Sequence, residues 1–218
     1  MKSAFLEIFS DKVKRPGADK YLEWLETTDF FEAPASTRFH LSRPGGLCTH
    51  HLHTYWRLRE RYMEEKQRNM PGPVELTPEE EESIAIVALT HDACKIDLYK
   101  MEPKNQKTYD PDKVKAAQRW QIKHDALGDF IWETVMGYKH DEELPYGHGE
   151  KSVYIVSSFM KLSREEAMAI RWHMGFSDIS FKGGSQDVGT AFGKYPLAVM
   201  MHIADLEATF LDEAEEKT

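Results

Sequence analysis

The chain of 218 residues is poor in cysteine and in long apolar runs. Only Cys48 and Cys94 occur, which excludes the disulfide framework of a small secreted domain. The first ten residues hold a short apolar run that Glu7 interrupts, so the apolar core of a secretory signal is missing. No window approaches the roughly 20 apolar residues of a membrane helix. We therefore expect a cytoplasmic protein without a membrane partner.

The chain also has little positive charge. Its 28 Lys and Arg residues are outnumbered by 37 Asp and Glu residues, which gives a net charge of −9. Long nucleic acids bind basic grooves that replace phosphate counterions, so this balance argues against such a partner. No linker divides the sequence, and we expect one domain over residues 1–218. The sequence leaves the oligomeric state open.

Apolar residues recur at helical spacing over most of the chain, which predicts an all-α bundle. Two N-terminal helices, at 2–14 and 18–28, would cap the core within residues 1–35. Thr77, Pro78 and Glu80 form a capping box that opens a further helix. The remaining helices are expected at 47–68, 148–160, 163–173 and from Pro196, before an acidic, solvated tail at 211–218.

Residues 99–146 interrupt this pattern and are interpreted as an insertion into a core that spans 36–210. A helix is expected from Asp110-Pro111 through Gln121. The aromatic and β-branched residues of 130–136 favour a strand, so a small β-hairpin is predicted in this insertion.

The segment Ile84–Lys95 begins as an apolar helix and ends at His91, Asp92 and Lys95. A helix that is apolar on every side belongs in the core, where an imidazole and a carboxylate need a partner. A metal ion would satisfy both, and the negative pole of a helix C-terminus favours a cation. A buried His91 that is hydrogen-bonded to Asp92 is the alternative.

Four further residues could complete such a site, because each lies in or beside an apolar helical pattern: His50, His148, His173 and Asp205. The order His, His-Asp, His, His, Asp resembles the HD-domain superfamily of metal-dependent phosphohydrolases, in its members with six metal-site residues. The resemblance covers roughly residues 36–210 and implies an HD-like helical bundle. Periodicity does not choose among His50, His51 and His53, but the family's Gly-Gly-Leu-x-x-His spacing selects His50.

The resemblance implies that His50, His91, Asp92 and Asp205 hold a first metal ion. Asp92 would bridge to a second ion held by His148 and His173. Imidazoles and carboxylates suit iron, manganese, cobalt, nickel or zinc, so one or two divalent transition metal ions are expected.

Three functions are compatible with this set of residues. The first is a hydrolase that attacks a nucleotide or another small phosphate ester or diester with metal-activated water, for which a 3'-5' exonuclease-like phosphodiesterase is a variant. The second is a di-iron oxygenase, because some similar proteins use the same set to activate dioxygen. The third is a metal-stabilised binding module without turnover.

Four basic residues are candidates for binding the substrate phosphate. Lys95 follows the motif as His91-Asp92-x-x-Lys95, near the same helix end, although a lysine there could serve only the helix dipole. Arg38 and Arg43, in the loop before the 47–68 helix, are either phosphate contacts or solvated surface residues. Arg171 lies two residues before His173 and points elsewhere on an ideal helix, so it is a secondary candidate.

Overall fold

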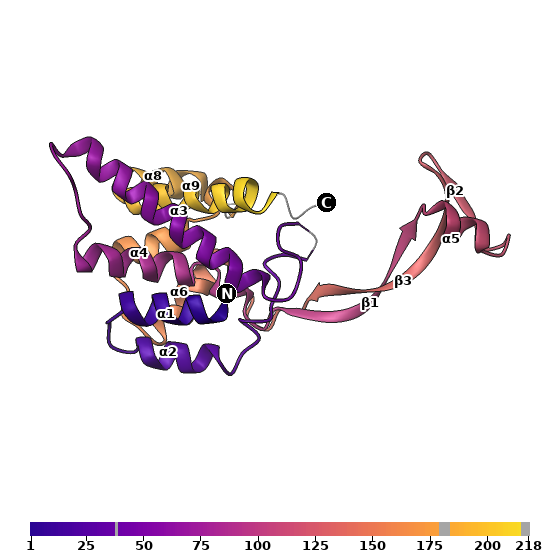
Figure 1. Ribbon diagram of the computed structural model, residues 1–218, viewed down its shortest axis with the longest axis horizontal. Coiled ribbons are helices and arrows are strands. Elements are labelled where there is room, and N and C mark those ends of the chain that lie inside the picture. The colour runs from indigo at the N-terminus through magenta and orange to yellow at the C-terminus, as the bar shows by residue number, and fades with distance from the viewer. Residues whose placement is uncertain (38, 179–183, 215–218) are drawn as a thin grey trace. The chain divides into compact units, whose positions relative to one another are not determined.

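A computed structural model describes residues 1–37, 39–178 and 184–214, so the candidate Arg38 lies outside the described residues (Figure 1). The chain divides into two compact units. One contains residues 1–98 together with the chain from 142 onward, and the other contains residues 99–141. The second unit falls within the 99–146 insertion, and the single-domain assignment of residues 1–218 stays a prediction.

The first unit is helical, as predicted. Its helices are α1 (Lys2–Lys12), α2 (Ala18–Leu25), α3 (Gly46–Asn69), α4 (Pro78–Thr90), α6 (His148–Ser157), α7 (Arg164–Arg171), α8 (Gly184–Lys194) and α9 (Pro196–Glu207). Two 3₁₀ turns, η1 (Ala93–Lys95) and η2 (Gly175–Ser177), and a π-helical turn, η3 (Ala208–Asp212), complete it. Helix α8 was not expected from the sequence. Within the described residues, no helix has both the length and the apolar composition of a membrane span.

Helix α4 lies in the middle of the helical unit and packs against α1, α3 and α7 (Figure 1). Its start is the predicted capping box, in which the Thr77 hydroxyl accepts from the Glu80 N–H and the Glu80 carboxylate accepts from the Thr77 N–H. Every residue of 84–90 is buried, which confirms that this apolar run is a core helix. The helix ends at His91, and the backbone of Asp92 (φ −102°, ψ 24°) turns into η1.

Close backbone packing brings the start of α6 to the end of α7. A Cβ on Gly149 would lie 2.1 Å from the carbonyl oxygen of Arg171, so only glycine permits this approach. As a result, His148 at the start of α6 and His173 just beyond α7 place their ring centroids 5.1 Å apart.

Glu166 connects three parts of the helical unit and is 1% exposed. It completes the capping box of α7 with Ser163, as the sequence indicates. Its carboxylate also accepts hydrogen bonds from the Ser83 hydroxyl (2.7 Å) on α4 and from Arg15 Nη1 (2.5 Å), between α1 and α2. Burial would raise the pKa of Glu166, but the hydrogen bond from Arg15 leads the interactions that hold this pKa below its ordinary value.

Glu166→Ala should lower the free energy of unfolding by about 3 kcal/mol at neutral pH, because it removes the most buried partner of Arg15 and leaves Arg15 paired only with Glu82. Because the pKa of Glu166 is lower in the folded than in the unfolded chain, its carboxylate stabilises the fold fully at a pH above the pKa of an unfolded glutamate. This stabilisation is lost as the pH falls through the pKa of Glu166 in the folded protein. The difference between wild type and variant should therefore shrink in acid. Denaturant unfolding across pH measures it, with the exposed neighbour Arg164→Ala as a control expected to stay within about 0.5 kcal/mol. An Ala variant as stable as wild type at neutral pH would contradict this role.

The second unit contains an antiparallel sheet of strand order β1-β3-β2. Strand β1 (Tyr99–Thr108) pairs with β3 (Gly128–His140) from Tyr99↔His140 to Thr108↔Ile131, and β2 (Lys123–Asp125) pairs with the start of β3. Helix α5 (Pro111–Ala116) begins at the predicted Asp110 cap but ends five residues before the expected Gln121. The mainly helical fold is thus confirmed, and the predicted hairpin is part of a three-stranded sheet.

Candidate metal centre

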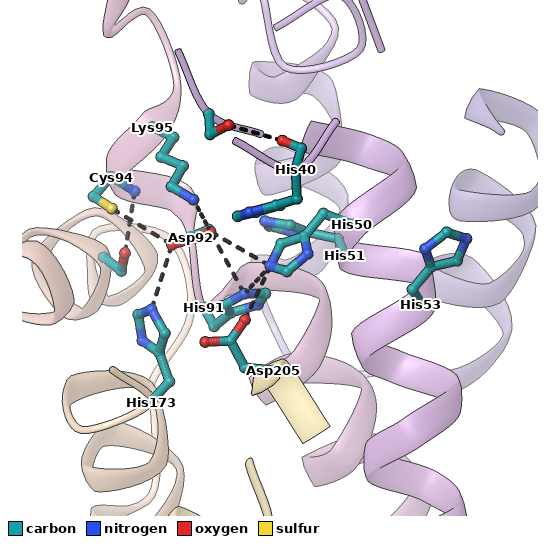
Figure 2. A network of polar contacts seen from close by, with 12 residues as sticks. His40, His50, His51, His53, His91, Asp92, Cys94, Lys95, His173 and Asp205 are labelled. Carbon is teal, nitrogen blue, oxygen red and sulfur yellow. Dashed lines mark hydrogen bonds and ion pairs between the residues drawn. The ribbon is translucent and has the colours of Figure 1, made fainter. Parts of the chain in front are cut away.

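Asp92 lies at the middle of a buried cluster of histidines and carboxylates (Figure 2). Its side chain is 2% exposed because it follows the core helix α4 directly. Lys95, one turn further along the chain, donates to Asp92 Oδ2 at 2.6 Å. The predicted motif therefore forms a single local unit in which the carboxylate and the ammonium are paired.

Three of the predicted histidines have the same hydrogen-bonding arrangement. The Nδ1 atom of His91 donates to the carbonyl of Ala88 (2.9 Å), and that of His173 donates to the carbonyl of Ile170 (2.7 Å). The Nδ1 atom of His50, on α3, donates to the Glu213 carboxylate (3.0 Å). An acceptor at Nδ1 fixes the proton there and leaves the Nε2 lone pair for another partner, which is the arrangement of metal-binding histidines.

These Nε2 atoms point into the cluster. His50 Nε2 lies 3.2 Å from His91 Nε2 and 3.2 Å from Asp205 Oδ1 on α9. His173 Nε2 is buried and has no hydrogen-bond partner in the part of the chain that the structure describes, although Asp92 Oδ1 is 3.4 Å away. A buried lone pair without a donor costs free energy unless a cation or a proton satisfies it, so these residues fit a metal ion.

The six predicted residues form two groups that meet at Asp92. In one, the potential ligand atoms of His50, His91 and Asp205 lie within 4.8 Å of one another. In the other, Asp92, His148 and His173 meet the same limit. Asp92 Oδ2 is 3.7 Å from His50 Nε2 and 3.6 Å from His91 Nε2, whereas Oδ1 is 2.7 Å from His148 Nε2. Each carboxylate oxygen thus faces one group, as a bridging ligand requires.

Both aspartates are held in the charged form. Burial alone would raise the pKa of each. For Asp92 the Lys95 ammonium leads the opposing charges and holds the pKa well below its usual value. For Asp205 the hydrogen bond with His50 outweighs burial and lowers the pKa of the carboxyl. The cluster therefore offers two buried carboxylates in the form that binds a cation.

The pKa values of the buried histidines shift in two directions. Burial lowers the pKa of His91 well below its ordinary value, so this ring is neutral. Burial also acts on His50, but hydrogen bonds with Asp205 and Glu213 outweigh it and raise the pKa to about 10. The pKa of His173 is raised too, because the attraction of the nearby Asp92 carboxylate outweighs burial. The carboxylates thus draw positive charge to Nε2 of His50 and His173, where a divalent cation would replace the proton.

The candidate phosphate-binding residues are placed unequally. Lys95 is at the centre, whereas Arg43 lies on an exposed stretch of chain. Arg171 stacks its guanidinium on the Trp172 ring and pairs with Glu150 (2.9 Å) and Asp178 (3.0 Å). Arg171 therefore ties α6, α7 and the chain after η2 together, and its contact with a phosphate stays a prediction.

Two residues beside the cluster were only partly anticipated. The Cys94 thiol lies 3.4 Å from His148 Nδ1 and 3.9 Å from Asp92 Oδ1, and burial raises its pKa. His51 donates from Nδ1 to the carbonyl of Leu89 (2.9 Å), so it connects α3 to α4.

The largest departure from the sequence analysis is Glu213. It belongs to the tail that was expected to be solvated, yet it is 1% exposed. Its neighbour His40, in the loop before α3, was not among the predicted site residues, and His40 Nε2 is buried with no hydrogen-bond partner among the described residues. Neither position carries a local sequence signal, since an acidic terminal run is usually solvated.

The chain matches no known protein family, no curated protein and no solved structure in the comparisons made. What the structure does show is a cluster of buried histidines and aspartates that could bind a metal and that is compatible with an HD-type site.

Proposed function

We propose that the protein is an HD-type, metal-dependent phosphohydrolase that acts on a nucleotide or another small phosphate ester or diester. The observation that carries the proposal is the pair of neighbouring ligand groups at Asp92, which belongs to the group of His148 and His173 and turns Oδ2 toward His50 and His91, with Lys95 on the same carboxylate. Two adjacent cation sites with a bridging carboxylate and a nearby ammonium are suited to holding an anionic phosphoryl group while water attacks it.

In this proposal His50, His91, Asp92 and Asp205 hold one ion, and Asp92, His148 and His173 hold the other. Divalent ions at these positions would lower the pKa of a water molecule and withdraw charge from a phosphoryl oxygen. Asp92 stays ionised and would bridge the two ions, because each of its oxygens faces one of the two ligand groups. Lys95, 12% exposed, offers its ammonium to the phosphoryl oxygens on which charge develops.

The test is reconstitution of metal-free protein with Mn²⁺, Fe²⁺, Co²⁺, Ni²⁺ or Zn²⁺, followed by a panel of nucleotides, phosphomonoesters and phosphodiesters. We expect hydrolysis that depends on added metal and is abolished by a chelator. Metal-loaded protein that cleaves none of these compounds, while its di-iron form consumes dioxygen with an organic substrate, would instead make it an oxygenase.

Salt dependence should separate a small substrate from a polymer. A polymer held through 6–10 phosphates loses about 10³–10⁵-fold in affinity between 50 and 200 mM salt, whereas a mononucleotide held by metal should change little. The net charge of −9 favours the small substrate. Hydrolysis rates on mononucleotides and on single-stranded oligonucleotides, measured across this range of salt concentration, distinguish the two kinds of substrate. Faster oligonucleotide cleavage with a steep salt dependence would make the enzyme exonuclease-like.

A further inference from the structure

Glu213 is brought into the core by the last turn of the described chain. Helix α9 continues into the π-helical turn η3, and the Glu213 N–H closes that turn by donating to the Ala208 carbonyl at 3.0 Å. π-Helical turns are rare and occur frequently at functional sites. The turn places the Glu213 side chain, 1% exposed, beside the same His50 that Asp205 contacts from α9.

The Glu213 carboxylate is surrounded by three histidines. Its Oε1 atom accepts hydrogen bonds from His50 Nδ1 (3.0 Å) and His53 Nδ1 (3.1 Å). Its Oε2 atom lies 4.0 Å from His40 Nε2, and both of these atoms are buried with no hydrogen-bond partner among the described residues. Because one oxygen of Glu213 accepts hydrogen bonds from both His50 and His53, the carboxylate fixes the orientation of these two rings.

One face of α3 holds the C-terminal segment in place. His50, His53, Arg57 and Arg61 follow one another at spacings of three and four residues, so they lie on the same side of the helix. Arg57 Nε donates to Asp212 Oδ2 at 2.8 Å, and Arg61 Nε donates to Glu207 Oε2 at 3.0 Å. Glu213 is thus delivered to His50 by a segment that is anchored along α3.

His50 differs from the other two histidines in what holds its Nδ1 atom. His91 and His173 donate to carbonyls three residues earlier in their own helical turns, so their orientation is set locally. His50 donates to a charged carboxylate 163 residues away. A charged acceptor forms the stronger hydrogen bond and makes the opposite ring nitrogen a better electron donor to a metal.

We propose that Glu213 is a positioning residue that orients His50 for the first metal ion, and that the hydrogen bond from His53 keeps the Glu213 carboxylate in place. This inference rests on the metal centre of the proposed function. It predicts an unequal effect on the two ions, because Glu213 contacts His50 but neither His148 nor His173 among its described hydrogen bonds.

The test is titration of the metal-free full-length chain with Co²⁺, followed by its visible absorption. Wild type should bind two ions. Glu213→Ala should weaken one of them by about 100-fold, and Glu213→Gln, which keeps an acceptor oxygen without the charge, by about 10-fold, while the other ion stays at wild-type affinity. The matched control is Asp212→Asn, which keeps an oxygen that can accept from Arg57 and leaves the Arg61 pair with Glu207 in place, so the segment should stay docked and both affinities should be unchanged.

The outcomes separate the two claims. If wild type binds two ions and both Glu213 variants bind two with wild-type affinity, Glu213 does not position His50. If Asp212→Asn weakens binding as much as Glu213→Ala, the effect comes from docking of the segment and the positioning role is wrong. If wild type itself binds no Co²⁺, the metal centre fails and the role of Glu213 fails with it. The isosteric Gln variant preserves the test should Glu213→Ala not fold.

Discussion

Asp92→Ala should leave a protein that retains neither ion and hydrolyses no phosphate ester above background. Asp92 faces both ligand groups, with Oδ2 toward His50 and His91 and Oδ1 toward His148. Its removal leaves the remaining ligands without the carboxylate that would separate and neutralise two adjacent cations. Metal affinity should fall by more than the roughly 10–100-fold that is typical when a residue hydrogen-bonded to a metal ligand is removed.

The measurement combines elemental analysis after reconstitution with hydrolysis rates for wild type and variant. Asp92→Asn keeps the shape of the side chain but removes its charge, so it should show nearly the same loss. Asp19→Ala, an exposed carboxylate on α2, should retain wild-type metal content and rate. An Asp92→Ala protein with full metal content and full activity would contradict a binuclear centre.

Lys95→Ala should lower turnover by about 10²–10³-fold while metal content stays at the wild-type level. The ammonium is paired with Asp92 Oδ2 at 2.6 Å and is 12% exposed, so it lies within the centre and remains partly accessible. An ammonium that stabilises developing charge contributes mainly to the transition state, and kcat should therefore fall more than the affinity for metal.

Metal content and steady-state kinetics on the same preparations test this role, with the exposed Lys20→Ala as a control. A parallel loss of metal and of activity in Lys95→Ala would show that the lysine serves Asp92 structurally. Unchanged turnover would remove Lys95 from the catalytic residues altogether.

The sequence was informative where local rules and burial agree. Thr77, Pro78 and Glu80 fix the start of α4, and the apolar run after them has only the core to enter, so both were predictable. His91 and Asp92 then follow as polar groups that the core helix carries inward. The pairing of His50, His148, His173 and Asp205 with them needed the order of the residues as well, because periodicity alone did not choose among the histidines of α3.

Long-range packing explains what the sequence did not reveal. Glu213 is buried because α3 presents His50 and His53 to it, which no local pattern in an acidic segment encodes. Strand β2 forms through pairing with β3, and α5 stops at Ala116, where the backbone turns to an extended conformation at Ala117. The ion pairs of Arg171 with Glu150 and Asp178 join different segments and were likewise not evident from the sequence, while its contact with a phosphate stays a prediction.

The central claim is that this chain holds two metal ions at named positions. The most direct measurement is anomalous X-ray scattering from crystals of protein reconstituted with Mn²⁺. We expect two anomalous peaks, one among His50, His91, Asp92 and Asp205 and the other among Asp92, His148 and His173. Crystals of metal-treated protein with no anomalous peak at either position, or with ions bound only elsewhere, would contradict it.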